Sequence, residues 1–163
     1  MIYTSDETKI EKYPNIKNYF ELFKDKLINR AEANENKYSW FRLQRPRRQE
    51  LFDAPEKIVV PYRAPENRFS YDPFQCYNDG GDIRVIVPKK ETFVDLKYIL
   101  AILNSKTINY YYKFIGRPKG DVFEYFVEPL SKIPIHKIDF SNQSDKSKHD
   151  ELIMLVNSLT LSH

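Results

Sequence analysis

The sequence predicts an α+β fold: a small, mostly antiparallel, twisted sheet packed against an N-terminal helix and a central helical spine. The longest segment with a clean helical pattern runs from Asp95 to Gly116 and predicts the spine. Short β-branched and aromatic runs, bounded by proline or by turn residues, lie before and after it and predict the strands. A length of 163 residues is typical of one domain that buries a core without disulfides.

The predicted spine has one apolar face. Its apolar residues recur at i, i+3, i+4 and i+7, and they are Leu96, Ile99, Leu100 and Leu103. Asp95 is placed to cap the amino end. Asn104-Ser105 either divides the helix or kinks it, with Asn104 bonding backbone groups. The run Tyr110–Tyr112 is expected to pack in the helix, with one or two tyrosines facing solvent.

The first third of the chain predicts a helix and a strand. The helix is expected over residues 15–33, with Pro14 in its first turn. The aromatic segment Tyr38–Leu43 alternates in part and predicts a strand, in which Trp40 is expected to be a core residue. Residues 47–52 suit a helical turn.

The remaining strands are short. They are expected at residues 57–61, 68–72, 83–87 and 122–127, and an extended segment at 133–135 closes the fold. Residues 73–82 form a loop that contains the strongest turn signal of the chain, Asn78 to Gly81. Gly116 to Gly120 is expected to be a second loop.

The tail changes in composition. Residues 141–148 are polar and of low complexity, which predicts a linker. Residues 152–159 then form a short amphipathic helix with no obvious partner. Such a helix is expected in a truncated chain, or where the helix packs on something outside it.

The charge distribution says more than the net charge. Lys plus Arg number 26 and Asp plus Glu 23, and a net charge of +3 does not by itself point to nucleic acid. Four arginines fall within residues 42–48, and a second basic cluster spans 113–119. Each cluster is interpreted either as a solvated face or as a polyanion-binding site.

The search for a catalytic set is negative. Cys76 is the single cysteine, which excludes a disulfide within the chain and a cysteine-based zinc site. His136, His149 and His163 form no metal-ligand pair, and there is no glycine-rich phosphate loop. The absence of a signal peptide and of a long apolar run predicts a cytoplasmic protein without a membrane partner.

An ordered series of motifs covers residues 13–138. The motifs are YPNIKNYFELFKDKLINR (13–30), QRPR (44–47), PEKIVVPYR (55–63), RFSYD (68–72), LKYILAILNSK (96–106), GRPKG (116–120) and EPLSKIPI (128–135). This order resembles the TaqI-like C-terminal specificity domain. That domain is the target-recognition domain of adenine-N6 DNA methyltransferases in restriction-modification systems, including fused type IIG restriction enzymes.

The resemblance implies a DNA target-recognition domain over residues 1–140, followed by a linker and the start of a C-terminal helix over 141–163. In such proteins the N-terminal methylase half holds the motifs for S-adenosylmethionine and for the flipped adenine, and neither motif occurs here. The chain is therefore expected to be a non-catalytic fragment without a cofactor or metal of its own. Its expected partners are double-stranded DNA and the parent's methyltransferase domain. The parent would use S-adenosylmethionine, and Mg²⁺ if an endonuclease is fused.

The resemblance also implies two kinds of DNA contact. Candidates for phosphate contacts, which position the domain, are Arg45, Arg47, Arg48, Arg117 and Lys119. Candidates for base contacts are Arg42, Gln44, Arg63, Arg68, Gln75, Asn78 and Asp79. The glycines of Gly116–Gly120 suit close approach to phosphates, or they form a surface turn.

Two alternatives remain open. The chain is half of a type I restriction specificity subunit, or it is a protein-interaction module without a DNA role. A methylase motif upstream favours the target-recognition domain of a methyltransferase, and a second recognition domain downstream favours the type I subunit. Salt-dependent DNA binding distinguishes both from the interaction module.

Overall fold

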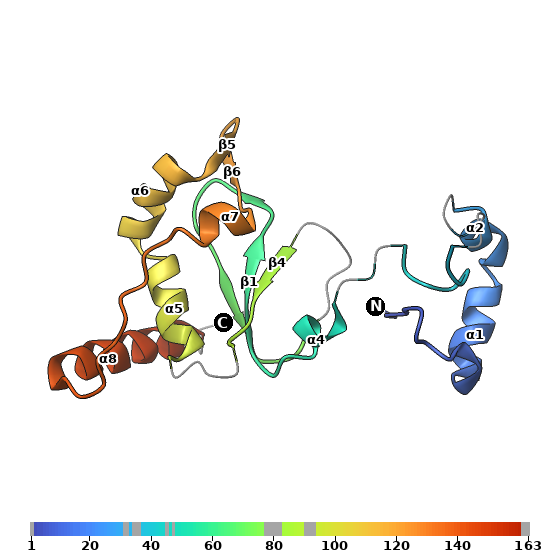
Figure 1. The fold of residues 1–163 in the computed structure, drawn as a ribbon, viewed down its shortest axis with the longest axis horizontal. Coiled ribbons are helices and arrows are strands. Elements are labelled where there is room, and N and C mark those ends of the chain that lie inside the picture. The colour runs from blue at the N-terminus through green and yellow to red at the C-terminus, as the bar shows by residue number, and fades with distance from the viewer. Residues whose placement is uncertain are drawn as a thin grey trace. The chain divides into compact units, whose positions relative to one another are not determined.

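The computed structural model describes residues 2–30, 33, 37–44, 46, 48–76, 83–89 and 94–160 (Figure 1). These residues form helices and two small antiparallel sheets, so the predicted α+β class is confirmed, although the single expected sheet is two. The chain divides into two compact units, Met1–Glu50 and Leu51–His163. Within the described ranges, no helix combines the length and the apolar character that a bilayer span needs.

The first unit contains short helices in place of one long one. They are η1 (Ile10–Lys12), α1 (Pro14–Glu21) and α2 (Lys24–Ile28), and Pro14 occupies the first turn of α1 as predicted. The single helix over 15–33 is wrong, because the backbone leaves helical geometry at Phe23, where φ is −117° and ψ is 10°. Neither α1 nor α2 has a buried residue, so core packing does not favour one straight helix.

The segment Tyr38–Leu43 is irregular, and the strand predicted there is wrong. The side chain of Arg30 supplies hydrogen bonds that a neighbouring strand would otherwise donate to this segment. Arg30 Nη2 donates to the carbonyl oxygens of Trp40 (2.7 Å) and Arg42 (2.8 Å). The guanidinium satisfies these backbone acceptors, so no hydrogen-bonded ladder is needed.

The first sheet of the second unit has three antiparallel strands in the order β3-β1-β4. They are β1 (Lys57–Pro61), β3 (Ser70–Asp72) and β4 (Ile83–Ile86), each within a predicted run, and α4 (Gln49–Phe52) before them agrees with the predicted helical turn. Both outer strands run antiparallel to β1. The connection that leaves Asp72 therefore starts opposite Lys57, and it ends at Ile83, opposite Pro61.

The second sheet has the order β2-β6-β5. Its strands are β2 (Arg63–Ala64), β5 (Arg117–Lys119) and β6 (Val122–Glu124), and β6 lies within the predicted strand 122–127. The loop predicted at Gly116–Gly120 is wrong, because its central residues form β5. Pro118 is compatible with β5, since an edge strand does not use every backbone N–H. Figure 1 shows the β5–β6 hairpin following the end of the spine.

The spine consists of two helices, α5 (Leu96–Leu103) and α6 (Lys106–Ile115), divided at Asn104-Ser105 as predicted. Asp95 caps α5, because its Oδ1 accepts from the backbone N–H of Lys97 at 2.7 Å. Ser105 Oγ accepts from Ile108 N–H at 3.2 Å and caps α6. A cap of this kind stabilises a helix by about 1 kcal/mol.

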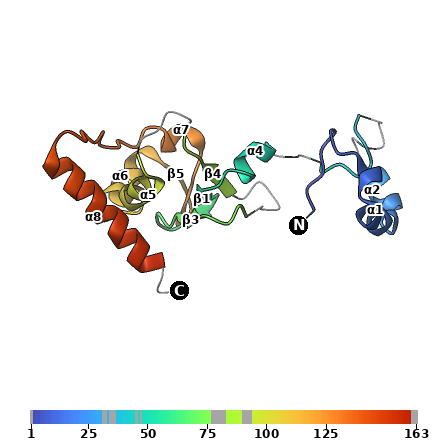
Figure 2. The ribbon, with the colours of Figure 1, turned by 90° about the horizontal axis from the view of Figure 1, so that it is seen from below.

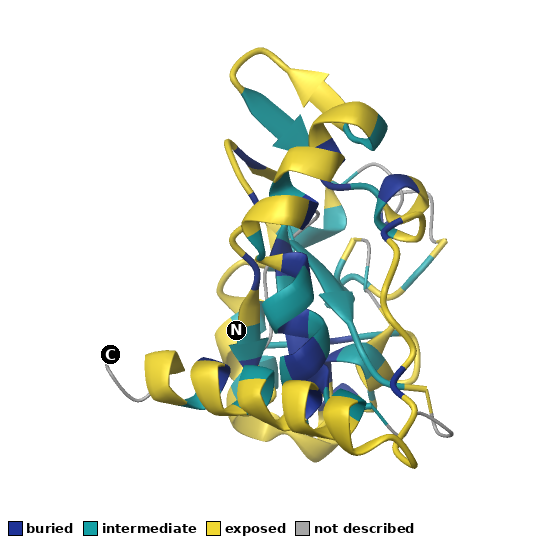
Figure 3. Ribbon diagram, turned by 90° about the vertical axis from the view of Figure 1, so that its left-hand side faces the viewer, coloured by how far each residue is buried: buried dark blue, intermediate teal, exposed yellow. Residues whose placement is uncertain are grey.

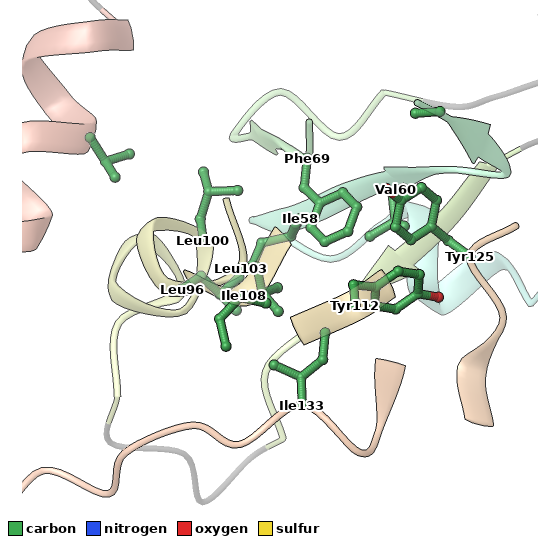
Figure 4. Close-up of a cluster of buried hydrophobic side chains, with 12 residues drawn as sticks. Ile58, Val60, Phe69, Leu96, Leu100, Leu103, Ile108, Tyr112, Tyr125 and Ile133 are labelled. Atoms are coloured by element: carbon green, nitrogen blue, oxygen red, sulfur yellow. The ribbon is translucent and has the colours of Figure 1, made fainter. Parts of the chain in front are cut away.

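The core of the second unit lies between the spine and the first sheet (Figure 4). The predicted apolar face of the spine is confirmed, since Leu96, Leu100 and Leu103 are buried and Ile99 is partly buried. These residues pack in one cluster with side chains from both sheets and from α6, which include Ile58, Val60, Phe69, Ile108, Tyr112 and Tyr125. β2 and β6, two of the strands of the site described below, contribute Ala64 and Phe123 to this cluster and are thereby packed against the spine.

The chain ends in two further helices, α7 (Val127–Leu130) and α8 (Gln143–Thr160). Most of the predicted linker 141–148 is helical, because Asn142 Oδ1 accepts from Ser144 N–H at 2.9 Å and begins α8. The polar residues that predicted a linker are also typical of helix starts. The amphipathic helix at 152–159 is confirmed, but its expected lack of a partner is wrong, because α8 packs along α5 (Figure 2) and Val156 joins the core.

Candidate nucleic-acid interface

Positively charged side chains share one face of the second sheet. Arg63, Glu124 and Arg117 lie opposite one another on β2, β6 and β5, and opposed residues of antiparallel strands point to the same side. Lys119 follows Arg117 by two residues on β5, so it points to that side too. We call Arg63, Arg117 and Lys119 the basic face. All three are exposed, and Figure 3 shows β5 and the turn of the hairpin as exposed and β6 as intermediate.

The other face of the second sheet contacts α6 through Phe123, while Pro118 on the same face is exposed. Ala64, Phe123 and Pro118 are opposed there, and Ala64 is buried. Phe123 meets Tyr112 of α6 edge to face, with ring centroids 5.9 Å apart. The helix therefore fixes the sheet from one side, and the basic face points to solvent.

Two glycines shape the hairpin for different reasons. Gly120 has a φ of +61° and forms, with Asp121, the turn between Lys119 and Val122. The first position of such a turn favours glycine. Gly116 has a φ of −75°, but a Cβ there would lie 2.6 Å from Tyr112 Cδ1 and 2.7 Å from Tyr112 O. Turn geometry and packing account for both glycines without a phosphate.

Aromatic rings support the guanidinium groups. Arg63 Cζ lies 4.8 Å from the Tyr62 ring centroid, and Arg117 Cζ lies 5.0 Å from that of Phe126. The two rings meet edge to face at 5.7 Å, so they form one continuous layer. Arg84 of β4 lies 5.3 Å from the same Tyr62 ring. Cation–π contacts of this kind restrict the orientation of the guanidinium plane.

Glu124 lies between the two arginines of this face. Its Oε1 accepts from Arg63 Nε at 2.9 Å, from Arg63 Nη2, and from the Tyr62 hydroxyl at 3.2 Å. The hydrogen bond from Arg63 lowers the pKa of Glu124, and the same bond raises the pKa of Arg63. Both groups are therefore charged at neutral pH and cancel each other. The net positive charge of the face comes from Arg117 and Lys119.

The connection between β3 and β4 starts from a buried ion pair. Lys57 Nζ lies 3.0 Å from Asp72 Oδ2 and donates to the Phe52 carbonyl oxygen at 3.1 Å. The Asp72 carboxylate also accepts from the backbone N–H groups of Phe74 (2.8 Å) and Cys76 (3.0 Å). Burial raises the pKa of Asp72, but these hydrogen bonds and the Lys57 charge outweigh burial and lower the pKa overall. The ionised carboxylate fixes the backbone from Asp72 to Cys76.

This anchored backbone presents two side chains. Phe74 is 83% exposed. Gln75 has a φ of +56°, which is uncommon for a residue other than glycine, and its Nε2 donates to the Asp53 carbonyl oxygen at 3.0 Å. Three residues of this connection are predicted to contact bases, and Gln75 is the one that lies within the described residues. Asn78 and Asp79 lie outside the described residues.

The family model of the TaqI-like C-terminal specificity domain matches residues 4–135 of the chain. The chain belongs to this family. The match confirms the resemblance that the ordered motifs indicated, and it includes both sheets and the whole spine.

The specificity domain is also similar to type II methyltransferases. It is 30% identical over 157 residues to M.HincII of Haemophilus influenzae, which covers 93% of this chain and 31% of that protein. It is 30% identical over 157 residues to M.HindII of Haemophilus influenzae (strain ATCC 51907 / DSM 11121 / KW20 / Rd), and this match covers 93% of the chain and 30% of that protein. It is 31% identical over 101 residues to M.BanIII of Aneurinibacillus aneurinilyticus, and this match covers 61% of the chain and 17% of that protein. The chain spans less than a third of the length of these relatives.

Asparagine side chains at the α5–α6 junction of the specificity domain hold the segment before β3. Asn104 Oδ1 accepts from Phe69 N–H and its Nδ2 donates to Phe69 O, both at 2.9 Å. Asn109 Oδ1 accepts from Asn67 N–H at 2.9 Å. The predicted backbone-bonding role of Asn104 is therefore confirmed. Arg68, a predicted base contact, lies between the two held residues and is exposed.

Two aromatic and basic candidates pack within the first unit of the specificity domain. Arg42 Nε lies 2.8 Å from Asp6 Oδ2, its Cζ lies 4.7 Å from the Tyr38 ring centroid, and its side chain is 18% exposed. Trp40 is partly buried, with Lys24 Nζ 5.1 Å from its ring centroid. Packing inside the unit is the observed role of both side chains.

The other candidates of the first unit are exposed or lie outside the described residues. Gln44 and Arg48 are exposed, and Arg48 Nε is 3.5 Å from Glu50 Oε1. Arg45 and Arg47 lie outside the described residues. In the described part of the chain, no three His, Cys, Asp or Glu side chains group as metal ligands would.

The tyrosines of α6 divide as predicted between core and solvent. Tyr112 is buried and stacks on Tyr125, with ring centroids 4.9 Å apart. Tyr110 is 62% exposed and lies next to Phe114, which is also exposed. One ring of the run therefore packs in the core, and another faces solvent.

Sequence reasoning missed β2, the face shared by Arg117 and Lys119, and the position of Glu124. One local signal was present, because Gly-Asp between two short extended runs is typical of a two-residue hairpin. Recognising it would place Arg117 and Lys119 on one face by strand alternation. No local signal pairs Arg63 with Glu124, which are 61 residues apart in the chain.

Proposed function

We propose that the chain is the sequence-specific DNA-recognition domain of a restriction-modification methyltransferase that modifies adenine at N6. The domain itself is non-catalytic and lies on double-stranded DNA, while a methyltransferase domain of the parent protein acts on the target base. The parent takes its methyl group from S-adenosylmethionine, and it uses Mg²⁺ where an endonuclease is fused. The family match and the type II methyltransferases among the relatives support this proposal.

The observation that carries the proposal is the basic face. Arg117 and Lys119 are exposed on one face of an edge strand, and that strand pairs with β6, whose Phe123 packs on Tyr112 of α6. Exposed cations on a rigid element suit phosphate contacts, which set the register of a protein on a duplex. We assign these two residues to phosphate contacts.

Base readout is assigned to side chains at both ends of β1. Arg63 follows Pro61 by two residues, and Pro61 is opposite Ile83, where the connection from Asp72 ends. Gln75 lies near the start of that connection, which is opposite Lys57 at the other end of β1. Arg68, on its held backbone, is the third candidate in the second unit. Donor-bearing side chains of these types recognise guanine or adenine edges in the major groove.

The test measures the affinity of the chain for duplex DNA, by fluorescence anisotropy, between about 50 and 200 mM salt. The logarithm of the association constant should fall linearly with the logarithm of the salt concentration. Arg117→Ala combined with Lys119→Ala should weaken binding about equally for all sequences and reduce the slope by about two. Each substitution removes one phosphate contact in this proposal.

The matched control is Lys146→Ala combined with Lys148→Ala. These two exposed lysines are also two residues apart, but they lie on α8. The control removes the same charge, and it should leave the salt slope unchanged. Absent binding at about 50 mM salt, or binding insensitive to salt, would contradict the proposed function. A changed sequence preference in the hairpin variant would place Arg117 or Lys119 among the base contacts.

A protein-interaction role is the second candidate, and one observation favours it. The outer side of α8 exposes Met154, Leu155 and Leu159, which are 52–69% exposed. In half of a type I specificity subunit, this side would dock on a partner subunit. Docking of this side on a partner protein together with absent or salt-insensitive DNA binding would favour a protein-interaction module. Docking on a partner subunit together with salt-dependent DNA binding would favour the type I subunit.

A further inference from the structure

Arg63 is held more tightly than the other members of the basic face. Its Nε and Nη2 both donate to Glu124 Oε1, and its plane lies near the Tyr62 ring. The Tyr62 hydroxyl donates to the same oxygen, so the carboxylate is fixed as well. Despite these contacts, the Arg63 side chain is 47% exposed.

The remaining donors of Arg63 form a bidentate edge. A guanidinium carries five N–H bonds, and Glu124 uses one on Nε and one on Nη2. Both N–H bonds of Nη1 and the second one of Nη2 remain. The end formed by Nη1 and Nη2 presents two parallel donors, which match the O6 and N7 acceptors of guanine.

The charge of the pair argues against a phosphate role for Arg63. Arg63 and Glu124 together carry no net charge, so they neutralise little of the charge on a DNA backbone. Their directional donors are nevertheless retained. Arg117, by contrast, lies over an apolar ring, Phe126, and the Glu128 carboxylate near it is paired with Lys132. Neutral but directional donors are what base readout needs.

We infer that Arg63 is a specificity-determining residue that reads a guanine in the major groove, and that Glu124 and Tyr62 are positioning residues that hold its guanidinium. The inference rests on the proposed function, and it adds that the base contacted by Arg63 is guanine. Holding the side chain before binding reduces the rotamer freedom that is lost on contact.

The experiment first determines the preferred sequence of the full chain, by selection from random duplexes and sequencing. Affinities are then measured for duplexes with each base at each position. Arg63→Lys keeps a charge opposite Glu124 but loses the bidentate edge. It should reduce the preference for guanine at one position from about 5- to 150-fold to nearly none, with an unchanged salt slope.

The positioning residues are tested at that same position. Glu124→Gln should reduce the guanine preference there, because the ionic hold on the guanidinium is lost. Tyr62→Phe keeps the ring and removes the hydroxyl, so it should retain most of the preference. Thermal unfolding of each variant identifies those that lose the fold, and Lys146→Arg, at an exposed position on α8, is the control for an exchange of one cation for the other. It should leave every base preference unchanged.

Three outcomes would overturn the inference. Arg63→Lys or Arg63→Ala weakens binding equally for all sequences and lowers the salt slope by about one, as a phosphate contact does. Alternatively, Glu124→Gln changes a position that Arg63→Lys leaves intact, so the carboxylate itself reads the base. Finally, the folded Arg63 and Glu124 variants keep every base preference of the original chain. In that case the only role of the ion pair is to join β2 to β6. If the original chain does not bind DNA, the proposed function fails first, and the inference fails with it.

Discussion

Lys57 and Asp72 illustrate how single residues set the position of the segment that follows β3. Asp72 is the last residue of β3, and its carboxylate holds both Lys57 and the backbone of the residues that follow. The sequence shows neither fact, because a lysine at the start of an apolar run is expected to be the solvent-exposed end of a strand. Only the register of β1 with β3 places the two side chains opposite each other.

We expect Lys57→Met to destabilise the protein by about 3–5 kcal/mol at neutral pH, because it leaves a buried carboxylate without its counter-ion. Urea unfolding monitored by circular dichroism measures the change. Lys106→Met, at an exposed position in the first turn of α6, is the control and should cost less than about 0.5 kcal/mol. Equal unfolding midpoints for the two variants would contradict the buried ion pair.

The same pair predicts a pH dependence. The pKa of Asp72 is lowered in the folded protein, so its stabilisation is present above the unfolded value, about 4, and is lost as the pH falls through the folded value. The difference between the original chain and Lys57→Met should therefore be largest at neutral pH and should shrink in acid. Urea unfolding at several pH values checks this. A difference that stays constant down to about pH 2 would assign the loss to packing.

At the scale of elements, the sequence predicted those that are specified locally. The β-branched run of β1, the cap of α5 and the break at Asn104 each depend on neighbours in the chain. β2 was missed because it depends on a partner distant in the chain, β6. β5 was missed because Arg, Pro and Lys are not strand-forming residues, although its partner β6 follows after a two-residue turn. The first helix was overextended for the opposite reason, since a periodic stripe without a core to pack on does not keep one axis.

The hairpin glycines give a prediction at this scale. Gly116→Ala should destabilise the protein by about 1–3 kcal/mol, because the new Cβ overlaps the Tyr112 ring and carbonyl. Gly120→Ala meets open space and should cost about 1 kcal/mol, from its positive φ alone. Unfolding midpoints in urea compare the two. If Gly120→Ala proved the more harmful, the contact between Gly116 and Tyr112 would not govern this turn.

At the scale of the whole molecule, the two units differ in how much they bury. The cluster of buried apolar residues falls between Ile58 and Val156, all within the second unit. The described buried residues of the first unit are Thr4, Ile10 and Ala33. The predicted division of the chain at residue 140 remains a prediction, since α8 packs on α5 but no separate folding of either part has been measured.

This difference predicts the result of limited proteolysis. Trypsin should cleave after Arg48, whose side chain is 74% exposed, and release a resistant fragment that starts at Gln49. That fragment should unfold in urea with a midpoint close to that of the full chain, because it retains the whole cluster. Mass spectrometry identifies the fragment. Loss of its cooperative transition would show that the first unit stabilises the second.

The continuous stretch from Lys57 to Ala64 takes part in both sheets, and this has a consequence for how such a domain changes its target. The connection that follows Asp72 is fastened opposite Lys57 at its start and opposite Pro61 at its end, while Arg63 is fastened to β6. The interior of this connection can therefore be exchanged for another peptide without moving the guanidinium of Arg63. A domain built in this way is suited to grafting, since one short peptide can be replaced while the strands that carry it, and the remaining contacts, stay in register.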